Sequence, residues 1–215
     1  DQIGDIAIAD GRIVDLGPSV SDSSPERTID AEGLWVIPGL IDLSARLREP
    51  GATRKADIAS EARAAAAAGI TTLVMPPDTH PIIDSASVVD LIQHRAEVAN
   101  AARVVPLGAL TQGLLGEHLA GAAALAAAGC PALSDGGYPV QDSLVLRRAL
   151  EYAKTFDLPC LLTPLDTSLA QGCLNEGATA TRLGLPGIPV AAETAGLGRQ
   201  LPIAEVAGTR VHFGR

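Results

Sequence analysis

Aromatic side chains are scarce in this sequence. Only 2% of its 215 residues are Phe, Trp or Tyr, although 47% are hydrophobic, and alanine supplies much of that fraction. A chain of this length and apolar content can bury a sizeable core, which excludes a disordered chain. Small apolar side chains favour helices packed closely on a sheet.

Long apolar runs are also missing. Gly, Pro or a charged residue interrupts each run before it reaches the length of a membrane span, and no signal-peptide pattern is visible. The three cysteines, Cys130, Cys160 and Cys173, are widely spaced and odd in number, which favours reduced thiols over a disulfide scaffold. We therefore expect a cytoplasmic protein that does not enter a membrane.

Positive charge is in the minority. The chain has 16 Lys and Arg against 25 Asp and Glu, a formal net charge of −9. An acidic surface repels phosphate backbones and anionic lipids. Nucleic acid and membrane surfaces are thus not expected partners.

The N-terminal residues indicate a small β unit. Residues 5–17 alternate apolar and polar on both sides of Asp10-Gly11, which predicts a hairpin. Residues 27–36 predict a further short strand around a turn at 30–33. We assign residues 1–37 to part of a small β-sandwich domain.

From Pro38 onward the pattern alternates between strand and helix. Near-continuous apolar strands followed by helices predict an α/β fold with a parallel sheet and helices outside it. The predicted strands are 40–43, 70–75, 104–110, 131–133, 159–162 and 210–213, and the helices are 57–68, 85–99, 117–128, 143–155 and 194–207.

Doubly wound sheets and closed (β/α)8 barrels both fit this alternation. No Gly-x-Gly-x-x-Gly follows the first parallel strand, so the dinucleotide-binding form lacks support. We predict a TIM-type barrel over residues 38–215 that is incomplete, because such barrels have eight units in about 250 residues.

In such barrels the chemistry lies at the carboxyl ends of the strands. The first strand ends in the segment 43–51, Leu-Ser-Ala-Arg-Leu-Arg-Glu-Pro-Gly. Together with the preceding Gly-Leu-Ile-Asp, this segment strongly resembles bacterial class I dihydroorotases of the amidohydrolase superfamily. The resemblance implies two zinc-binding histidines at positions 44 and 46, followed by an arginine that holds the substrate carboxylate. Arg48 matches that arginine, whereas Ser44 and Arg46 replace the histidines.

The other strand ends depart from the family pattern as well. Asp78 stands where the resemblance implies a substrate-binding asparagine, and Asp135-Gly136 stands for a pair of aspartates of which one binds metal; which of the two was the ligand stays open. Thr163 and Arg215 occupy two further histidine positions. The segment 175–193 is again similar to the family, and its catalytic aspartate is expected after an eighth strand, beyond residue 215.

These replacements predict that no zinc site of the usual kind exists and that no cofactor is used. A hydroxyl is a poor zinc ligand, and a guanidinium has no lone pair to donate. Two alternatives are a site with His80 as a ligand, and an oxygen-ligand site for Mg²⁺ or Ca²⁺ formed by four acids. Those acids are Asp42, Asp78, Asp135 and Asp166. We favour instead an ion pair between Arg46 and one of these acids.

The resemblance then implies a function. It points to the catalytically inactive dihydroorotase homologues of de novo pyrimidine biosynthesis, which act as assembly subunits for the catalytic subunit of aspartate transcarbamoylase. We expect a homodimer within a larger hetero-oligomer. One alternative is an active, zinc-dependent cyclic amide hydrolase with an altered metal site, which interconverts N-carbamoyl-L-aspartate and dihydroorotate. Another is a metabolite sensor that uses Arg48.

Overall fold

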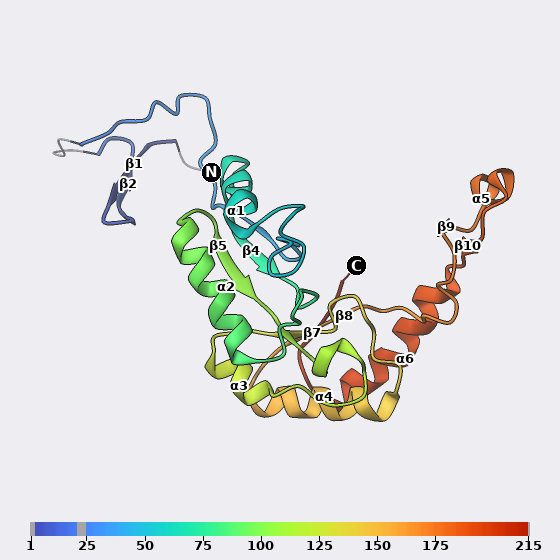
Figure 1. Ribbon diagram of the computed structural model, residues 1–215. Helices are drawn as coiled ribbons and strands as arrows, with labels where there is room; N and C mark the ends of the chain where they lie inside the picture. The colour runs from blue at the N-terminus through green and yellow to red at the C-terminus, as the bar shows by residue number, and fades with distance from the viewer. Residues whose placement is uncertain (1–2, 21–24, 215) are drawn as a thin grey trace. The chain divides into compact units, whose positions relative to one another are not determined.

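The computed structural model describes residues 3–20 and 25–214 (Figure 1). The chain divides into two compact units, Asp1–Pro38 and Gly39–Arg215, and each unit is described by itself. No helix within the described ranges is long and apolar enough to cross a bilayer.

The first unit contains the predicted hairpin. Strands β1 (Asp5–Ala9) and β2 (Arg12–Gly17) pair antiparallel. Asp10 and Gly11 connect them with φ values of 50° and 71°, the left-handed conformation that a tight hairpin turn requires.

The strand predicted over residues 27–36 is wrong. Only a turn forms there, closed by a hydrogen bond from the Leu34 amide to the Ala31 carbonyl at 3.0 Å. A strand exists only with a hydrogen-bonded neighbour, and no part of the chain that the structure describes pairs with this segment. Its apolar residues are accordingly exposed, Trp35 to 86%. A β-sandwich is therefore not seen here.

The second unit is built on parallel strands in chain order. One ladder runs β3–β4–β5 and the other runs β6–β7–β8–β11. The strands are β3 (Leu40–Asp42), β4 (Ile70–Met75), β5 (Arg103–Pro106), β6 (Gly108–Ala109), β7 (Leu133–Ser134), β8 (Cys160–Leu162) and β11 (Val211–Phe213).

Strands β5 and β6 are successive parts of one extended stretch. The Leu107 amide between them donates to the Met75 carbonyl at 2.9 Å, and the Gly108 amide donates to the Ala132 carbonyl at 3.1 Å. The stretch therefore joins both ladders into one series that begins at β3 and ends at β11. The parallel α/β architecture is as predicted, and the series is open within the described residues.

Helices connect these strands and cover the sheet (Figure 1). They are α1 (Ile58–Ala67), α2 (Ala86–Ala99), α3 (Ala122–Ala127), α4 (Ser143–Thr155) and α6 (Ala191–Ala207). Helix α1 starts at Asp57, whose carboxylate accepts from the Ser60 amide while Ser60 reaches back to the Asp57 amide. Leucines and alanines fill the core, including Leu125, Leu150, Ala62 and Ala149, which are all at most 2% exposed.

Helix α3 is shorter than predicted. Residues 117–121 are not helical, because the Gln112 amide donates to the His118 carbonyl and Thr111 bridges to Leu119. These tertiary contacts hold the segment against the end of β6. Gly121 then begins the helix.

Some short elements were not predicted. A 3-10 turn, η1 (Gln112–Leu114), follows β6. Between β8 and α6 the chain forms β9 (Leu174–Asn175), α5 (Ala178–Leu183) and β10 (Gly187–Ile188). Strands β9 and β10 pair in parallel, two residues each.

Candidate functional site

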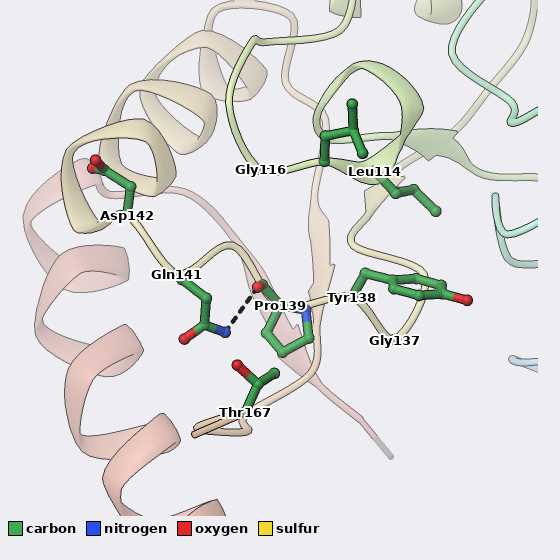
Figure 2. A pocket seen from close by; sticks show the side chains of 9 residues that line it. Leu114, Gly116, Gly137, Tyr138, Pro139, Gln141, Asp142 and Thr167 are labelled. Carbon is green, nitrogen blue, oxygen red and sulfur yellow. Dashed lines mark hydrogen bonds between the residues drawn. The ribbon is translucent and has the colours of Figure 1, made fainter. Parts of the chain in front are cut away.

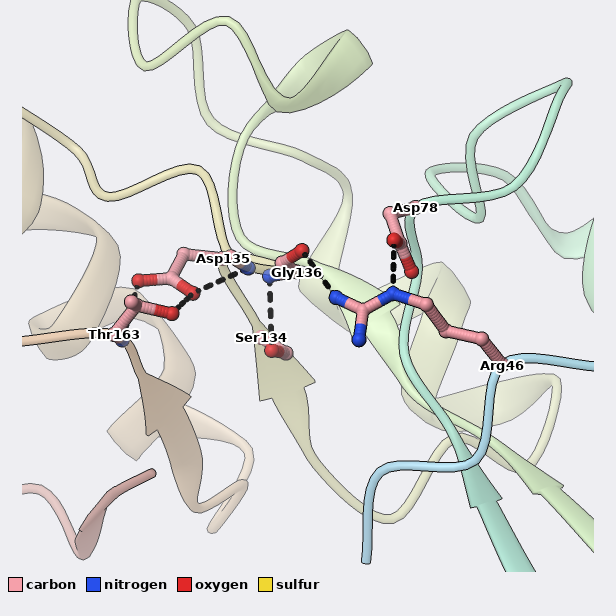
Figure 3. Close-up of polar contacts among 7 residues, drawn as sticks. Arg46, Asp78, Ser134, Asp135, Gly136 and Thr163 are labelled. Carbon is pink, nitrogen blue, oxygen red and sulfur yellow. Dashed lines mark hydrogen bonds and ion pairs between the residues drawn. The ribbon is translucent and has the colours of Figure 1, made fainter. Parts of the chain in front are cut away.

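The carboxyl ends of the strands bring most of the predicted site residues into one region (Figure 3). Arg46 follows β3, Asp78 follows β4, Asp135 and Gly136 follow β7, and Thr163 follows β8. Ser44 follows β3 and is exposed, and its amide donates to the Asp42 carboxylate at 2.9 Å. The predicted Arg215 lies outside the described residues.

Arg46 forms the predicted ion pair with an acid. Its Nε donates to Asp78 Oδ2 at 2.6 Å, and its Nη2 lies 3.5 Å from the Gly136 carbonyl oxygen. The Asp78 side chain is 17% exposed and that of Arg46 is 42% exposed. The guanidinium therefore links the ends of β3, β4 and β7 while keeping one side open to solvent.

Asp135 is the buried acid of the region. Its Oδ2 accepts from the Thr163 amide at 2.7 Å, and its Oδ1 accepts from the Thr163 hydroxyl at 2.8 Å and the Gly137 amide at 3.1 Å. Burial raises the pKa of this carboxyl, and these three hydrogen bonds oppose the rise. Both oxygens of the Asp135 carboxylate therefore accept hydrogen bonds from the protein itself.

Arg48 lines a cavity that also includes the Arg46–Asp78 ion pair. It is exposed, has a φ of 66°, and shares this cavity of about 340 Å³ with Arg46, Asp78, Thr79 and His80. No acid within residues 3–20 and 25–214 forms an ion pair with Arg48. The cavity therefore offers one unpaired guanidinium next to a neutralised one.

Glu49 fixes the loop that carries Arg48, and sequence reasoning missed it. The side chain is 6% exposed, forms an ion pair with Arg95 of α2, and accepts from the Ile58 amide at 2.9 Å. A carboxylate at a helix N-terminus satisfies an amide that lacks a partner within the helix. No local pattern marks this role, because Arg95 is 46 residues away along the chain.

A second cavity, of about 350 Å³, lies beside the loop after β7 (Figure 2). Tyr138, Pro139 and Gln141 line one side of it, and Leu114 to Gly116 line another. Arg199 of α6 supports this loop by donating to the Val140 and Gln141 carbonyls at 2.8 and 3.0 Å. Neither the cavity nor Arg199 was predicted.

The donor set does not fit zinc. Positions 44, 46 and 163 present two hydroxyls and a guanidinium, none of which is a zinc ligand of the usual kind. Within the described residues no three His, Cys, Asp or Glu side chains are grouped so as to hold a metal ion. The four acids of the alternative Mg²⁺ or Ca²⁺ site are not grouped in this way, since Asp78 pairs with Arg46 and Asp135 is hydrogen-bonded to Thr163.

Parallel strands in chain order, helices outside them and polar groups at the strand ends define a parallel α/β protein. Two solved structures have the same fold. The L-hydantoinase from Arthrobacter aurescens matches with a TM-score of 0.73 at 19% identity, over 96% of this chain and 48% of that one. The dihydroorotase from Saccharomyces cerevisiae, solved with 5-fluoroorotic acid, matches with a TM-score of 0.57 at 11% identity, over 83% and 48%.

Sequence comparison identifies the family. The family model described as dihydro-orotase-like matches residues 33–215, so the chain belongs to the dihydroorotase-like family. It is 49% identical to the dihydroorotase-like protein of Pseudomonas aeruginosa, over 99% of this chain and 51% of that protein. It is 44% identical to the dihydroorotase of Anaeromyxobacter sp. strain K, over 99% and 49%. The chain thus spans about half the length of these relatives, and the predicted family is confirmed.

Proposed function

We propose that this chain is part of a non-catalytic dihydroorotase-like protein of pyrimidine biosynthesis in the cytoplasm. The observation that carries the proposal is the Arg46–Asp78 ion pair at the strand ends. A fixed guanidinium repels a divalent cation and supplies no lone pair to it. Two further βα units in the full-length protein would close the barrel.

Hydrolysis of a cyclic amide needs an activated water and a polarised carbonyl. Within the described residues the strand ends offer no histidine ligand group for a metal that would do both. Asp135, which is buried there, has both carboxylate oxygens hydrogen-bonded to Thr163. These hydrogen bonds hold the Asp135 carboxylate against the protein, so that it is not directed toward a substrate as a proton donor or acceptor.

We further propose that the protein assembles with the catalytic subunit of aspartate transcarbamoylase and pairs with a second copy of itself. The support is the resemblance to inactive dihydroorotase homologues, together with strand ends that retain the family frame without its ligands. A folded protein of this family can act as an assembly subunit without catalysing a reaction.

Co-purification tests the proposal. The full-length protein is expressed with and without the transcarbamoylase catalytic subunit, and the products are sized by light scattering. We expect a stable hetero-oligomer, zinc far below one ion per chain, and no conversion of dihydroorotate. The Anaeromyxobacter dihydroorotase, prepared in parallel, serves as the control for metal retention and turnover. Stoichiometric zinc with turnover would establish the alternative, a cyclic amide hydrolase with an altered metal site.

A metabolite-sensing role is the second candidate, favoured by the unpaired Arg48 at its cavity. It predicts that N-carbamoyl-L-aspartate raises the melting temperature of the full-length protein, and that Arg48→Met removes the shift. Arg54→Met, an exposed arginine of a nearby turn, is the matched control. Equal shifts in both variants would dismiss a specific site.

A further inference from the structure

The polar contacts at the strand ends form a series rather than isolated pairs (Figure 3). Arg46 contacts Asp78 on one side and the Gly136 carbonyl on the other. The adjacent Asp135 contacts Thr163, whose carbonyl accepts from Gln200 of α6 at 2.9 Å. The series therefore runs from the end of β4, through those of β3, β7 and β8, to α6.

We propose that the Arg46 guanidinium takes the structural place of a metal ion. By contacting Asp78 and the Gly136 carbonyl it holds the ends of β3, β4 and β7 together, and we call this pair of contacts the Arg46 tie. This inference rests on the proposed function in one respect, that no metal performs the task. It goes further by assigning the task to one residue and its two partners.

The geometry requires arginine. Nε and Nη2 leave the guanidinium in different directions, so one side chain reaches an acid after β4 and a carbonyl after β7. A lysine ammonium is a single point charge and does not span both partners in this way. Lysine at position 46 should therefore keep the attraction to Asp78 and lose the link to Gly136.

The turn after β7 is shaped to present its carbonyl to Arg46. Gly136 and Gly137 have φ values of 61° and 91°, which disfavour any residue with a Cβ atom. A Cβ atom on Gly136 would lie 3.1 Å from Leu114 Cδ1, and one on Gly137 would lie 3.5 Å from Arg46 Nη2. The amides of this turn are bonded too: Gly136 to the Ser134 hydroxyl at 3.0 Å and Tyr138 to the Asp135 carbonyl at 2.8 Å. The hydrogen-exchange rates of these amides should therefore show whether the contacts of Arg46 with Asp78 and Gly136 are intact.

A double-mutant cycle on the full-length protein tests the tie. The variants are Arg46→Met, Asp78→Asn and both together, and the readouts are the urea unfolding equilibrium and amide exchange of residues 134–138. Because Arg46 is partly exposed, we expect a coupling of about two- to fivefold in the unfolding constant. Exchange at 134–138 should quicken in Arg46→Met, and less so in Asp78→Asn, which keeps Arg46 near Gly136.

The control is the exposed pair Arg147 and Glu151 on α4, changed to Met and Gln. These two substitutions should leave amide exchange at residues 134–138 unchanged. Additive effects of Arg46→Met and Asp78→Asn, or unchanged exchange in Arg46→Met, would overturn the role proposed for Arg46, whereas zinc content and dihydroorotate turnover decide the proposed function separately. Turnover of dihydroorotate by the unsubstituted protein would overturn the proposed function and leave the coupling as measured.

Discussion

Thr163 holds the carboxylate of Asp135 with two hydrogen bonds. Its amide nitrogen lies 2.7 Å from Oδ2 and its hydroxyl lies 2.8 Å from Oδ1. Thr163 stands where the family resemblance implies a histidine, and Asp135 is 2% exposed. The ends of β7 and β8 are therefore linked directly, through the hydrogen bonds that Thr163 donates to the Asp135 carboxylate.

Restoring two histidines should not restore a zinc enzyme. In Ser44→His with Arg46→His we expect zinc to stay well below one ion per chain and dihydroorotate turnover to stay at background. The reason is that Thr163 still occupies the oxygens of Asp135 and supplies no imidazole. Metal analysis and a turnover assay on the full-length variant check this. Recovered turnover would contradict the account of the site.

The buried acid should make stability depend on pH. Burial raises the pKa of Asp135 above 3.8, so its contribution to stability is fully present below that value and declines as the pH rises through the raised pKa. In Asp135→Asn this decline disappears. Urea unfolding at several pH values between 4 and 8 should show the stability of the variant, relative to the unsubstituted protein, increasing with pH.

Asp166 provides the matched control for that measurement. Hydrogen bonds from Ser168 lower the pKa of its carboxyl, so its stabilising effect is present above 3.8 and is lost as the pH falls through the lowered pKa. Between pH 4 and 8 Asp166→Asn should therefore change stability by a nearly constant amount, because the pH dependence of its contribution lies mostly below that range. The same trend in both variants would rule out burial as the cause for Asp135.

Replacing Glu49 should lower the free energy of unfolding. In Glu49→Ala the Ile58 amide loses a buried acceptor and Arg95 loses its partner. We expect a loss of about 1–3 kcal/mol in the free energy of unfolding, measured in urea. Glu151→Ala, which breaks an exposed pair on α4, should cost no more than about 0.5 kcal/mol. Similar costs for both variants would show that burial of Glu49 adds nothing.

The three cysteines should differ in reactivity. Burial raises the pKa of Cys130 and of Cys160 to about 12, while Cys173 is exposed. Since the thiolate is the reactive form, iodoacetamide at neutral pH should label Cys173 first in the folded protein and all three in urea. Mass spectrometry of the digested protein identifies the labelled sites. Labelling of Cys160 at the rate of Cys173 would contradict its burial.

Local pattern predicted the regular elements of the second unit well. The strand at 70–75 and the helix at 143–155 form over those residues, because a buried apolar run and a helical period are properties of the segment itself. The failures have non-local causes. The segment 27–36 has no pairing neighbour among the described residues, and residues 117–121 are drawn to β6 instead of continuing a helix.

By itself, the sequence determined which residues stand at the strand ends and that they cannot supply a usual zinc ligand set, because the chemistry of Ser44, Arg46 and Thr163 does not depend on the fold. The tertiary structure decided the partners. Arg46 pairs with Asp78 across 32 residues, and Asp135 pairs with Thr163 across 28. Such pairings follow from the parallel order of the strands, which brings their carboxyl ends together regardless of distance along the chain.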